Sequence, residues 1–483
     1  MRLLKLLILL FLLPCGCRDD SLQVRVSETA TNPSYLGNGV EWDPYDEASS
    51  WGCDISEEDW QKLFLRMDFM RPGYVRCMIS SPFRYFDGGK YDRQRNEASL
   101  LKLLEYCRTR DIEVIYGEFN PPDFSMKGDQ KWVEMSVDYL NYLVQEKGMD
   151  CIRHFIIFNE PDGYWASPNG DYDFWKSMMQ RFHDEMAKYP GLTDKVSLAG
   201  PDVVVDYRNP ASAFDAPGWV ARTAADLDHM VGLYDIHAYP GQHQVRSGAF
   251  AEALKSFKVP EGKKLVLGEA GYKYWRPEDA ALQAECDRRA ATDKLTRGSD
   301  SQMLCGEFFY GLDLPLLAMD VMDGGLSGMA VWMLDDSMHS NGDSGRPEDL
   351  KVWGFWNILG EEVFGDASLE EPKPAYYSWS LMCRYFPRGC DILETEAPQV
   401  DGLRMVAAGK DGHRTFAVVN FSDQSRVLDV QIPLSDGVRY EYVEGSCPVD
   451  ENGLPKPVST GLEGSSHRLC VPAQSFVLIS DFK

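Results

Sequence analysis

The segment HFIIFNEP, residues 154–161, places an apolar run directly before an amide and a carboxylate. The segment LVLGEAG, residues 265–271, repeats this arrangement with a second carboxylate. Short apolar runs of this kind are typical of strands buried on both faces of a parallel sheet. Further runs alternate with amphipathic segments of helical spacing. The eight expected strands are residues 35–42, 74–79, 113–119, 154–159, 196–201, 234–239, 264–269 and 328–334.

Strands that alternate with helices predict an α/β fold, and a count of eight favours a closed (β/α)8 TIM barrel over an open doubly wound sheet. No GxGxxG or Walker motif follows any of the runs, which argues against a nucleotide-binding fold. After residue 387 the pattern changes to short alternating strands, with turn signals at Asp411-Gly412 and Asp436-Gly437. This part is expected to form an all-β sandwich.

The expected organisation is a signal peptide at residues 1–17, an N-terminal segment at 18–34, a barrel at 35–386 and a sandwich at 387–483. Alternation from Leu22 to Val26 predicts that the N-terminal segment adds a strand to the sandwich. The 483 residues carry 49 basic and 75 acidic side chains, a formal net charge of −26. Such a charge repels phosphate backbones, so nucleic acid is not an expected partner.

Residues 1–17 have the order of a secretory signal, because Arg2 and Lys5 precede the apolar run Leu6 to Leu13. This run is too short to span a bilayer. Its end resembles the lipobox of bacterial lipoproteins, whose processed cysteine carries lipid, and Gly16 favours Cys17 over Cys15 as that cysteine.

The lipobox resemblance implies a membrane partner through an N-terminal lipid anchor. The acidic pair after Cys17 resembles the surface-export signal of Bacteroidetes lipoproteins. The expected location is therefore the outer membrane or cell surface of a Gram-negative bacterium, with ordinary cleavage and a periplasmic or secreted protein as the alternative.

The 12 cysteines show no CxxC or Cys/His ligand spacing, so most are expected to be small core residues. Two pairings stay open in the C-terminal part, Cys383 with Cys390 and Cys447 with Cys470.

Two carboxylates are expected at the barrel mouth, because the carboxyl ends of the strands meet there. Glu160 ends the fourth expected strand and Glu269 ends the seventh. A pair of carboxylates on separate rigid strands is the apparatus of glycoside hydrolysis, in which one protonates the leaving oxygen and the other attacks or activates water.

The motif Asn159-Glu160-Pro161 together with Glu269 resembles clan A of the glycoside hydrolases, the retaining (β/α)8 enzymes that include families 5, 30, 39 and 51. The resemblance covers about residues 35 to 480. It implies a carbohydrate substrate and a C-terminal sandwich, and no cofactor is expected. Other strand ends agree with the clan, namely Arg76, His237, Tyr239 and Trp332.

By this resemblance Glu160 is the general acid/base and Glu269 the nucleophile. Arg76 and the Tyr239 hydroxyl would keep Glu269 ionised by charge and hydrogen bonding, whereas Glu160 would hold a proton.

The other expected substrate-binding residues are an amide, a histidine and aromatic or polar loop residues. Asn159 would bond the sugar 2-hydroxyl and Trp332 would lie beneath the sugar ring. His237 is expected in the active site, and Asn120 and Trp165 lie on loops at the mouth.

Several alternatives remain at this stage. Glu41 and Glu118 also end expected strands and would replace the assigned glutamates if a strand register were wrong. A basic patch of Arg76, Lys273 and Arg276 could accept one substrate carboxylate.

Metal chemistry is the main enzymatic competitor on this fold, yet the first strand lacks the HxH pair of metal-dependent barrel hydrolases. His237 and His243 have no third plausible ligand, so no catalytic metal is expected. An acidic loop after the eighth strand could hold Ca²⁺, although a solvated loop is the preferred interpretation. Its residues are Asp335, Asp336, Asn341 and Asp343.

The sequence thus predicts a retaining glycosidase that acts on a polysaccharide or its oligosaccharides by double displacement. A non-catalytic carbohydrate-binding lipoprotein on the same scaffold is the alternative. The sugar, the linkage, and endo or exo action stay open.

Overall fold

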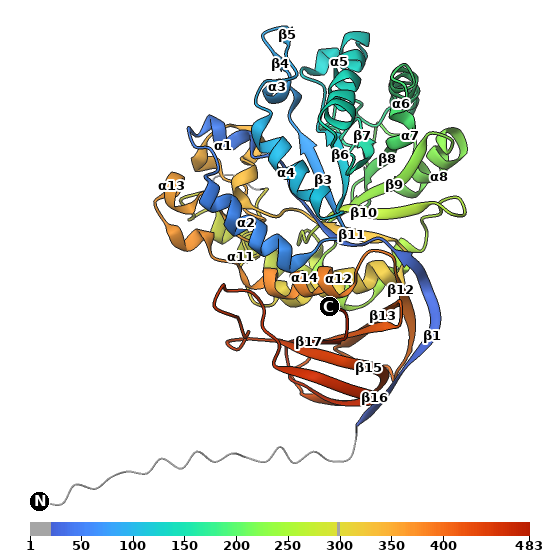
Figure 1. Ribbon diagram of the computed structural model, residues 1–483, viewed down its shortest axis with the longest axis vertical. Coiled ribbons are helices and arrows are strands. Elements are labelled where there is room, and N and C mark those ends of the chain that lie inside the picture. Colours follow the sequence, from blue (N-terminus) through green and yellow to red (C-terminus); the bar gives the residue numbers. More distant parts are fainter. Residues whose placement is uncertain (1–20, 297–299) are drawn as a thin grey trace, which may run out of the picture.

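A computed structural model describes residues 21–296 and 300–483, and Figure 1 shows a barrel next to a smaller β domain. Eight parallel strands follow one another around a closed barrel, so the predicted (β/α)8 fold is confirmed. Each expected segment overlaps one barrel strand. The strands are β2 (Gly37–Glu41), β3 (Tyr74–Ile79), β6 (Glu113–Glu118), β7 (Ile152–Ile156), β8 (Ser197–Val204), β9 (Val231–Ala238), β10 (Lys264–Ala270) and β11 (Gly328–Val331). Cys17, the predicted lipidation site, lies outside the described residues.

Helices cover the outside of the barrel (Figure 1). The longer ones are α2 (Glu57–Met70), α4 (Ala98–Thr109), α5 (Gln130–Asn141), α6 (Tyr172–Met186), α8 (Ala216–Leu227), α11 (Ala280–Ala290), α12 (Tyr310–Asp323) and α14 (Pro374–Tyr385). Short ones are α1 (Asp46–Ser50), α3 (Ser81–Arg84), α7 (Leu192–Lys195), α9 (Gln242–Arg246), α10 (Ala249–Leu254) and α13 (Gly360–Phe364). A two-stranded hairpin, β4 (Phe86–Asp87) and β5 (Lys90–Tyr91), projects from the rim.

Apolar side chains fill the inside of the barrel. Met78, Ile115, Ile156, Leu233 and Val266 are all buried there in one cluster. The barrel is therefore a packed core and not a pore, which leaves its mouth as the place for a site.

The C-terminal domain is a seven-stranded sheet that curls so that β1 (Leu22–Tyr35) contacts two of its strands. β1 pairs antiparallel with β12 (Cys390–Glu396) and parallel with β15 (Arg426–Val443). The other strands are β13 (Leu403–Lys410), β14 (His413–Asn420), β16 (Ser459–Val471) and β17 (Ser475–Ser480). The N-terminal residues Leu22 to Val26 thus lie in this sheet.

One of the two turns expected in this domain is present, and the prediction of the other is wrong. Asp411 and Gly412 connect β13 to β14 with φ angles of 52° and 87°, the left-handed pair that a tight hairpin needs. Asp436-Gly437 does not reverse the chain. β15 continues through it with a shift in its register to β16, so Asp436 occupies a bulge at φ 55°.

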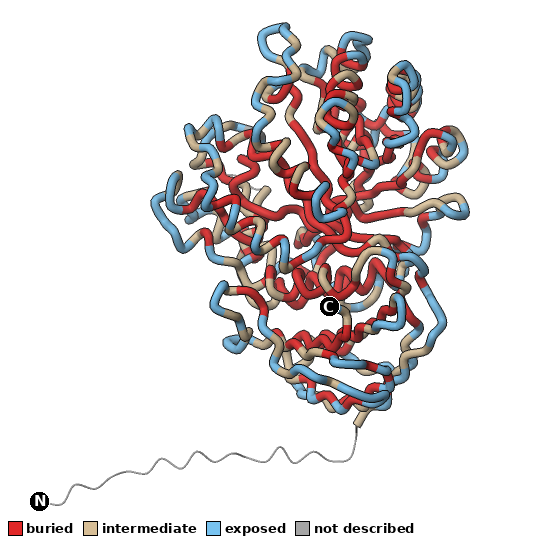
Figure 2. Tube along the Cα trace, in the orientation of Figure 1, coloured by how far each residue is buried: buried red, intermediate tan, exposed pale blue. Residues whose placement is uncertain are grey.

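Helices α12 and α14 lie between the barrel and the sheet, and both are almost fully buried (Figures 1 and 2). The Phe308 ring stacks on Tyr442 of β15 at 4.4 Å, and the Tyr442 hydroxyl donates to the Phe308 carbonyl at 2.9 Å. The two domains therefore share one apolar core.

All ten cysteines in the described part of the chain are free, so neither pairing left open by the sequence forms here, and seven of the ten are buried. No helix of the described residues is long and apolar enough to cross a bilayer.

Candidate active site

The two predicted carboxylates come together at the mouth. One oxygen of Glu160, one oxygen of Glu269 and a ring nitrogen of His237 lie within 4.8 Å of one another. Glu160 follows β7, and Glu269 is the penultimate residue of β10. The strand topology thus joins residues that are far apart in the sequence.

A bulge in β10 presents Glu269. The register of β10 shifts after Leu267 relative to both neighbouring strands. At the bulge, the Gly268 amide donates to the Asp235 carboxylate at 2.8 Å. A Cβ on Gly268 would lie 2.2 Å from both oxygens of that carboxylate, so only glycine fits there. Asp235 and Gly268 together set the position of the next residue, Glu269.

Glu269 is held as an acceptor on both oxygens. Arg76 Nη1 donates to Oε2 at 3.1 Å, and the Tyr239 hydroxyl donates to Oε1. Glu269 is only 6% exposed, and Arg76 is fully buried. A guanidinium and a hydroxyl donor thus engage both oxygens of the buried Glu269 carboxylate and fix its orientation.

Arg76 also contacts three other polar groups. Its Nη1 donates to Glu41 Oε2 at 2.5 Å, and its Nη2 donates to Asn159 Oδ1 at 2.6 Å and to Asp202 Oδ2 at 3.3 Å. Because Oδ1 of Asn159 faces Arg76, its Nδ2 faces away and can donate to a ligand hydroxyl. Glu41 is therefore a buried partner of Arg76 and does not replace Glu269.

Glu160 accepts bonds from two ring N–H groups. His237 Nδ1 lies 3.0 Å from Oε1, and Trp165 Nε1 donates to Oε2 at 2.6 Å. The Glu160 backbone is left-handed, with φ 49°, and its amide donates to Asp202 at 3.3 Å. This conformation is uncommon for a non-glycine residue and turns the side chain into the mouth.

Asp202 is also the second partner of His237, whose Nε2 lies 2.9 Å from Asp202 Oδ1. Burial lowers the pKa of His237, but the negative charges of Asp202 and Glu269 outweigh it and raise that pKa well above its usual value. Burial raises the pKa of Asp202, but His237 and Arg76 outweigh it and hold the pKa below its usual value. His237 is thus an imidazolium, and its two ring nitrogens face Glu160 and Asp202.

The cluster holds more carboxylates than cations, so some carboxylates keep their protons. Burial raises the pKa of Asp235 to about 7, and the nearby Asp202 adds to this. Burial likewise raises the pKa of Glu41 well above its usual value against the opposing charge of Arg76. The positive charge of Arg76 consequently acts mainly on Glu269 and Asp202.

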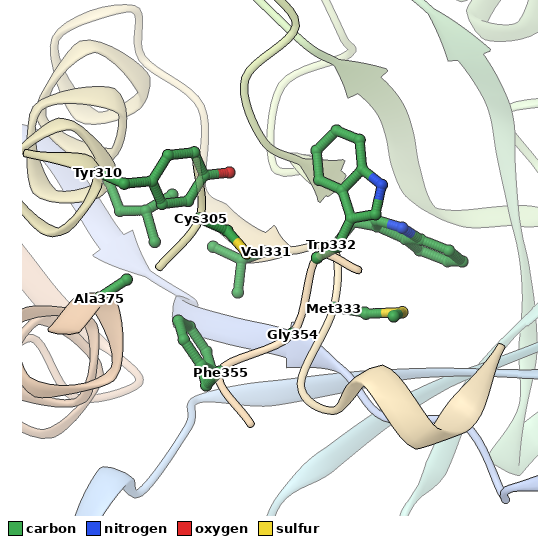
Figure 3. A pocket seen from close by; sticks show the side chains of 10 residues that line it. Cys305, Tyr310, Val331, Trp332, Met333, Gly354, Phe355 and Ala375 are labelled. Atoms are coloured by element: carbon green, nitrogen blue, oxygen red, sulfur yellow. The ribbon is translucent and has the colours of Figure 1, made fainter. Parts of the chain in front are cut away.

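Trp332 follows β11 and is 6% exposed. Its ring stacks on His339 at 5.1 Å, and His339 Nε2 lies 2.7 Å from Asp43 Oδ2. A void of about 10 Å³ lies behind it, where Tyr310 and Phe355 face it across the cavity (Figure 3). This void has room for about one water and none for a sugar, so it is not a substrate site.

Aromatic side chains also gather beside Glu160. Trp165 lies 5.0 Å from the Tyr164 ring and 4.7 Å from the Tyr207 ring. A Cβ on Gly163 would lie 2.3 Å from the Trp165 indole, so glycine lets that ring fold back onto Glu160. Tyr207, which follows β8, was missed in the sequence because nothing marked its loop as part of the mouth.

Two predicted positions lie outside the glutamate cluster. Asn120 links the mouth loops, since its Oδ1 accepts from the Ser167 amide at 3.2 Å. Glu118 is buried against α5, where it accepts from Tyr85 at 2.8 Å and Trp132 at 3.1 Å. Glu118 therefore does not compete with Glu160 or Glu269.

The expected basic patch does not form. Arg76 is buried in the barrel, Lys273 pairs with Asp300 at 3.2 Å, and Arg276 pairs with Asp206 at 3.3 Å. Each cation already has a carboxylate partner.

The acidic loop after β11 is not solvated as expected. Asp335 accepts from Trp356 Nε1 at 2.9 Å, and Asp336 pairs with Lys373 at 2.6 Å. Asp335 and Asp336 are 0% and 3% exposed, so these carboxylates support the fold.

Two clusters of the described residues have the spacing of a metal site. One is Glu160, His237 and Glu269, and the other is Asp202, Asp235 and His237. Both share the protonated His237 and neighbour the guanidinium of Arg76. A fixed positive charge beside a protonated ligand disfavours a divalent cation.

Asp202 and Asp235 were missed by the sequence reasoning. The fifth expected strand ends at Pro201, one residue before Asp202. The observed strand β8 runs on to Val204 and includes Asp202. Asp235 stands two residues before His237 on β9, so the alternation of a strand could have placed it on the inward face.

No protein-family model matches the chain, and no curated protein matches its sequence. Solved structures share its fold at low identity. The catalytic domain of a GH30 xylanase C from Talaromyces cellulolyticus has a TM-score of 0.63 at 14% identity, covering 95% of this chain and 99% of that one. An endo-β1,6-glucanase has a TM-score of 0.60 at 14% identity, covering 95% and 94%. A GH39 β-xylosidase from Caulobacter crescentus has a TM-score of 0.55 at 13% identity, covering 96% and 100%. The chain therefore has the barrel-and-sandwich fold of GH30 and GH39 glycoside hydrolases over nearly its whole length.

Proposed function

We propose that this protein is a retaining glycoside hydrolase that cleaves a polysaccharide or its oligosaccharides. The spacing of the two glutamates carries the proposal, because an oxygen of Glu160 and an oxygen of Glu269 lie within 4.8 Å. Retaining enzymes separate their carboxyl groups by about 5 to 5.5 Å, whereas inverting enzymes leave about 6.5 to 9.5 Å for a water molecule. Solved structures that share the fold include a xylanase, a xylosidase and a glucanase, which supports this proposal.

The reaction proceeds in two displacements. In the first, a Glu269 oxygen bonds to the anomeric carbon, and Glu160 gives its proton to the glycosidic oxygen as that bond breaks. In the second, Glu160 takes a proton from water, the water oxygen bonds to the anomeric carbon, and Glu269 leaves as a carboxylate.

The surrounding residues support each step. Arg76 and Tyr239 hold Glu269 with its charge on the mouth side. Asn159 can donate to the sugar 2-hydroxyl, a bond that strengthens in the oxocarbenium-like transition state. We assign Trp332 to the reacting sugar and Trp165, which bonds Glu160, to the leaving group, whereas Asn120 bonds the Ser167 amide and positions the loop that carries Trp165.

The test compares two glutamine variants on aryl glycosides. E269Q is expected to lose turnover of every substrate. E160Q is expected to keep activity on glycosides with good leaving groups and to lose it on substrates with sugar leaving groups, because only the latter need protonation. E118Q alters a buried glutamate outside the cluster and is expected to keep the wild-type kcat. Wild-type rates in E269Q, or an inverted product anomer by NMR, would contradict the proposal.

We also propose export with a lipid on Cys17, on the strength of the signal-like order of residues 1–17. β1 begins at Leu22, so a lipid there would hold the sheet domain next to the membrane. Mass spectrometry of the mature N-terminus tests this, and an unmodified terminus or cleavage elsewhere would overturn it. C17A is expected to release the protein from the membrane fraction.

A further inference from the structure

The extended segment after β10 alternates between buried and exposed side chains. Tyr272 and Tyr274 are 0% and 1% exposed, and the Tyr272 hydroxyl donates to the Asp313 carbonyl at 2.6 Å. Lys273 and Trp275 point to the other side, where Trp275 is 68% exposed. Two buried tyrosines thus fix a backbone that holds an indole out in solvent.

Lys273 connects this indole to the reaction centre. Its Nζ lies 4.9 Å from the Trp275 ring, 4.5 Å from the Tyr239 ring and 5.7 Å from the Trp353 ring. Tyr239 in turn donates its hydroxyl to Glu269. An ammonium among three aromatic rings gains cation–π attraction from each, so it holds Trp275 next to the nucleophile side of the mouth.

The same ammonium joins Trp275 to Trp332. Asp300 bridges Lys273 at 3.2 Å and Lys351 at 2.9 Å, and Lys351 Nζ lies 5.1 Å from the Trp332 ring. Trp275 and Trp332 therefore lie on one side of the mouth, linked by one ion-pair bridge.

Exposed aromatic side chains mark this face of the molecule. Among the described residues they are Phe124, Tyr164, Trp165 and Trp275, and each lies in a loop after a barrel strand. The Tyr164 and Trp165 group flanks Glu160, whereas Trp275 stands on the side of Glu269 and Trp332. Exposed indoles held rigidly are typical of surfaces that stack on sugar rings.

We infer that Trp275 forms a binding subsite for a pyranose ring of the substrate, beyond the reacting sugar and on its glycone side. This inference rests on the proposed function, which sets the position of the reacting sugar between Glu160 and Glu269. It names the ligand as a neutral oligosaccharide or polysaccharide with at least two sugars on that side of the cleaved bond. Aromatic groups on both sides of the glutamates then fit a substrate chain that crosses the mouth.

A glycone-length series tests the subsite. The substrates are 4-nitrophenyl glycosides of one, two and three sugars, from the xylose or glucose series that the wild type hydrolyses best. W275A is expected to lower kcat/KM at least tenfold on the two longer substrates and less than twofold on the single-sugar one. W275F keeps an aromatic face and is expected to recover most of the loss. L65A changes an exposed apolar side chain on α2, outside the mouth, and is the matched control that is expected to leave the whole series unchanged.

Two outcomes would overturn the inference. They are an equal loss at every glycone length and no loss at any length. Binding separates this inference from the proposed reaction. By calorimetry with xylohexaose and a β-1,6-glucohexaose, E269Q is expected to bind one of them at least tenfold more tightly than W275A/E269Q. Equal affinity, or no binding of either ligand, would refute the subsite even if no glycoside were hydrolysed.

Discussion

At the scale of single residues, His237 is the most informative group of the site. Its two nitrogens contact Glu160 and Asp202, so it ties Glu160 to a fully buried carboxylate. The charge of the His237 ring, which contacts Glu160, thus depends on the buried carboxylate of Asp202.

Replacing Asp202 should expose that dependence. In the native protein the raised pKa of His237 keeps the imidazolium at neutral pH, and D202N removes the main charge that raises it. The ring of the variant would then lose its proton at a lower pH than the ring of the native protein. D202N is expected to lower kcat/KM about tenfold or more at pH 8 and less than about threefold at pH 5.5.

The measurement is a pH profile on an aryl glycoside. D206N is a suitable control, because Asp206 bonds Arg276 and the Tyr239 amide but not His237. A D202N profile parallel to that of the wild type would contradict the role given to Asp202.

The sequence predicted the residues that end strands and missed those beneath them. Glu160, Glu269 and Arg76 stand after or within apolar runs, so a strand pattern locates them. Asp202 and Asp235 act through buried contacts that depend on how strands from different parts of the chain align. Such alignment has no local signal in one sequence.

At the scale of elements, the β10 bulge decides where the Glu269 carboxylate lies. Gly268 has no room for a side chain, because the Asp235 carboxylate occupies that space and bonds the Gly268 amide. A change at Gly268 would move Glu269 while leaving the aromatic surfaces in place.

G268A is accordingly expected to lower kcat by at least about a hundredfold with KM within about twofold, since small misplacements of a reacting group are costly. G306A is the control, because a Cβ there meets nothing within 4 Å. Wild-type kcat in G268A would refute the positional role of the bulge, and an equal loss in G306A would point to a general effect of alanine.

Strand patterns show where apolar runs occur but not how far a strand continues. Asp436-Gly437 has the composition of a hairpin turn, yet β15 passes through it because β16 pairs with β15 residues both before and after the dipeptide. Tertiary pairing outweighed the local turn preference there.

At the scale of the whole molecule, buried acids make stability depend on pH. Burial raises the pKa of Asp43 and of Asp162 to about 8 and that of Asp235 to about 7. Unfolded aspartates titrate near about 3.9, so between pH 4 and 8 the folded state binds more protons than the unfolded one. Stability therefore falls as pH rises, by up to about 1.4 kcal/mol per pH unit for each such group.

The raised pKa of His237 acts in the same direction above about pH 6.5, because only the folded state keeps that proton. The net charge of −26 adds repulsion at high pH. The melting temperature is expected to fall steadily from pH 6 to pH 9 at constant ionic strength, and calorimetry checks it. D162N should flatten the slope, and a melting temperature that rises with pH would exclude this account.

β1 has a consequence for how the chain folds during synthesis. It precedes the barrel in the chain, whereas its partner residues in β12 and β15, such as Ile392 and Val430, follow the barrel. The barrel strands follow one another in chain order, so they can assemble as they appear. The sheet can close only after all the barrel strands have appeared, and a chain truncated before β15 would keep β1 as an open strand edge that invites aggregation.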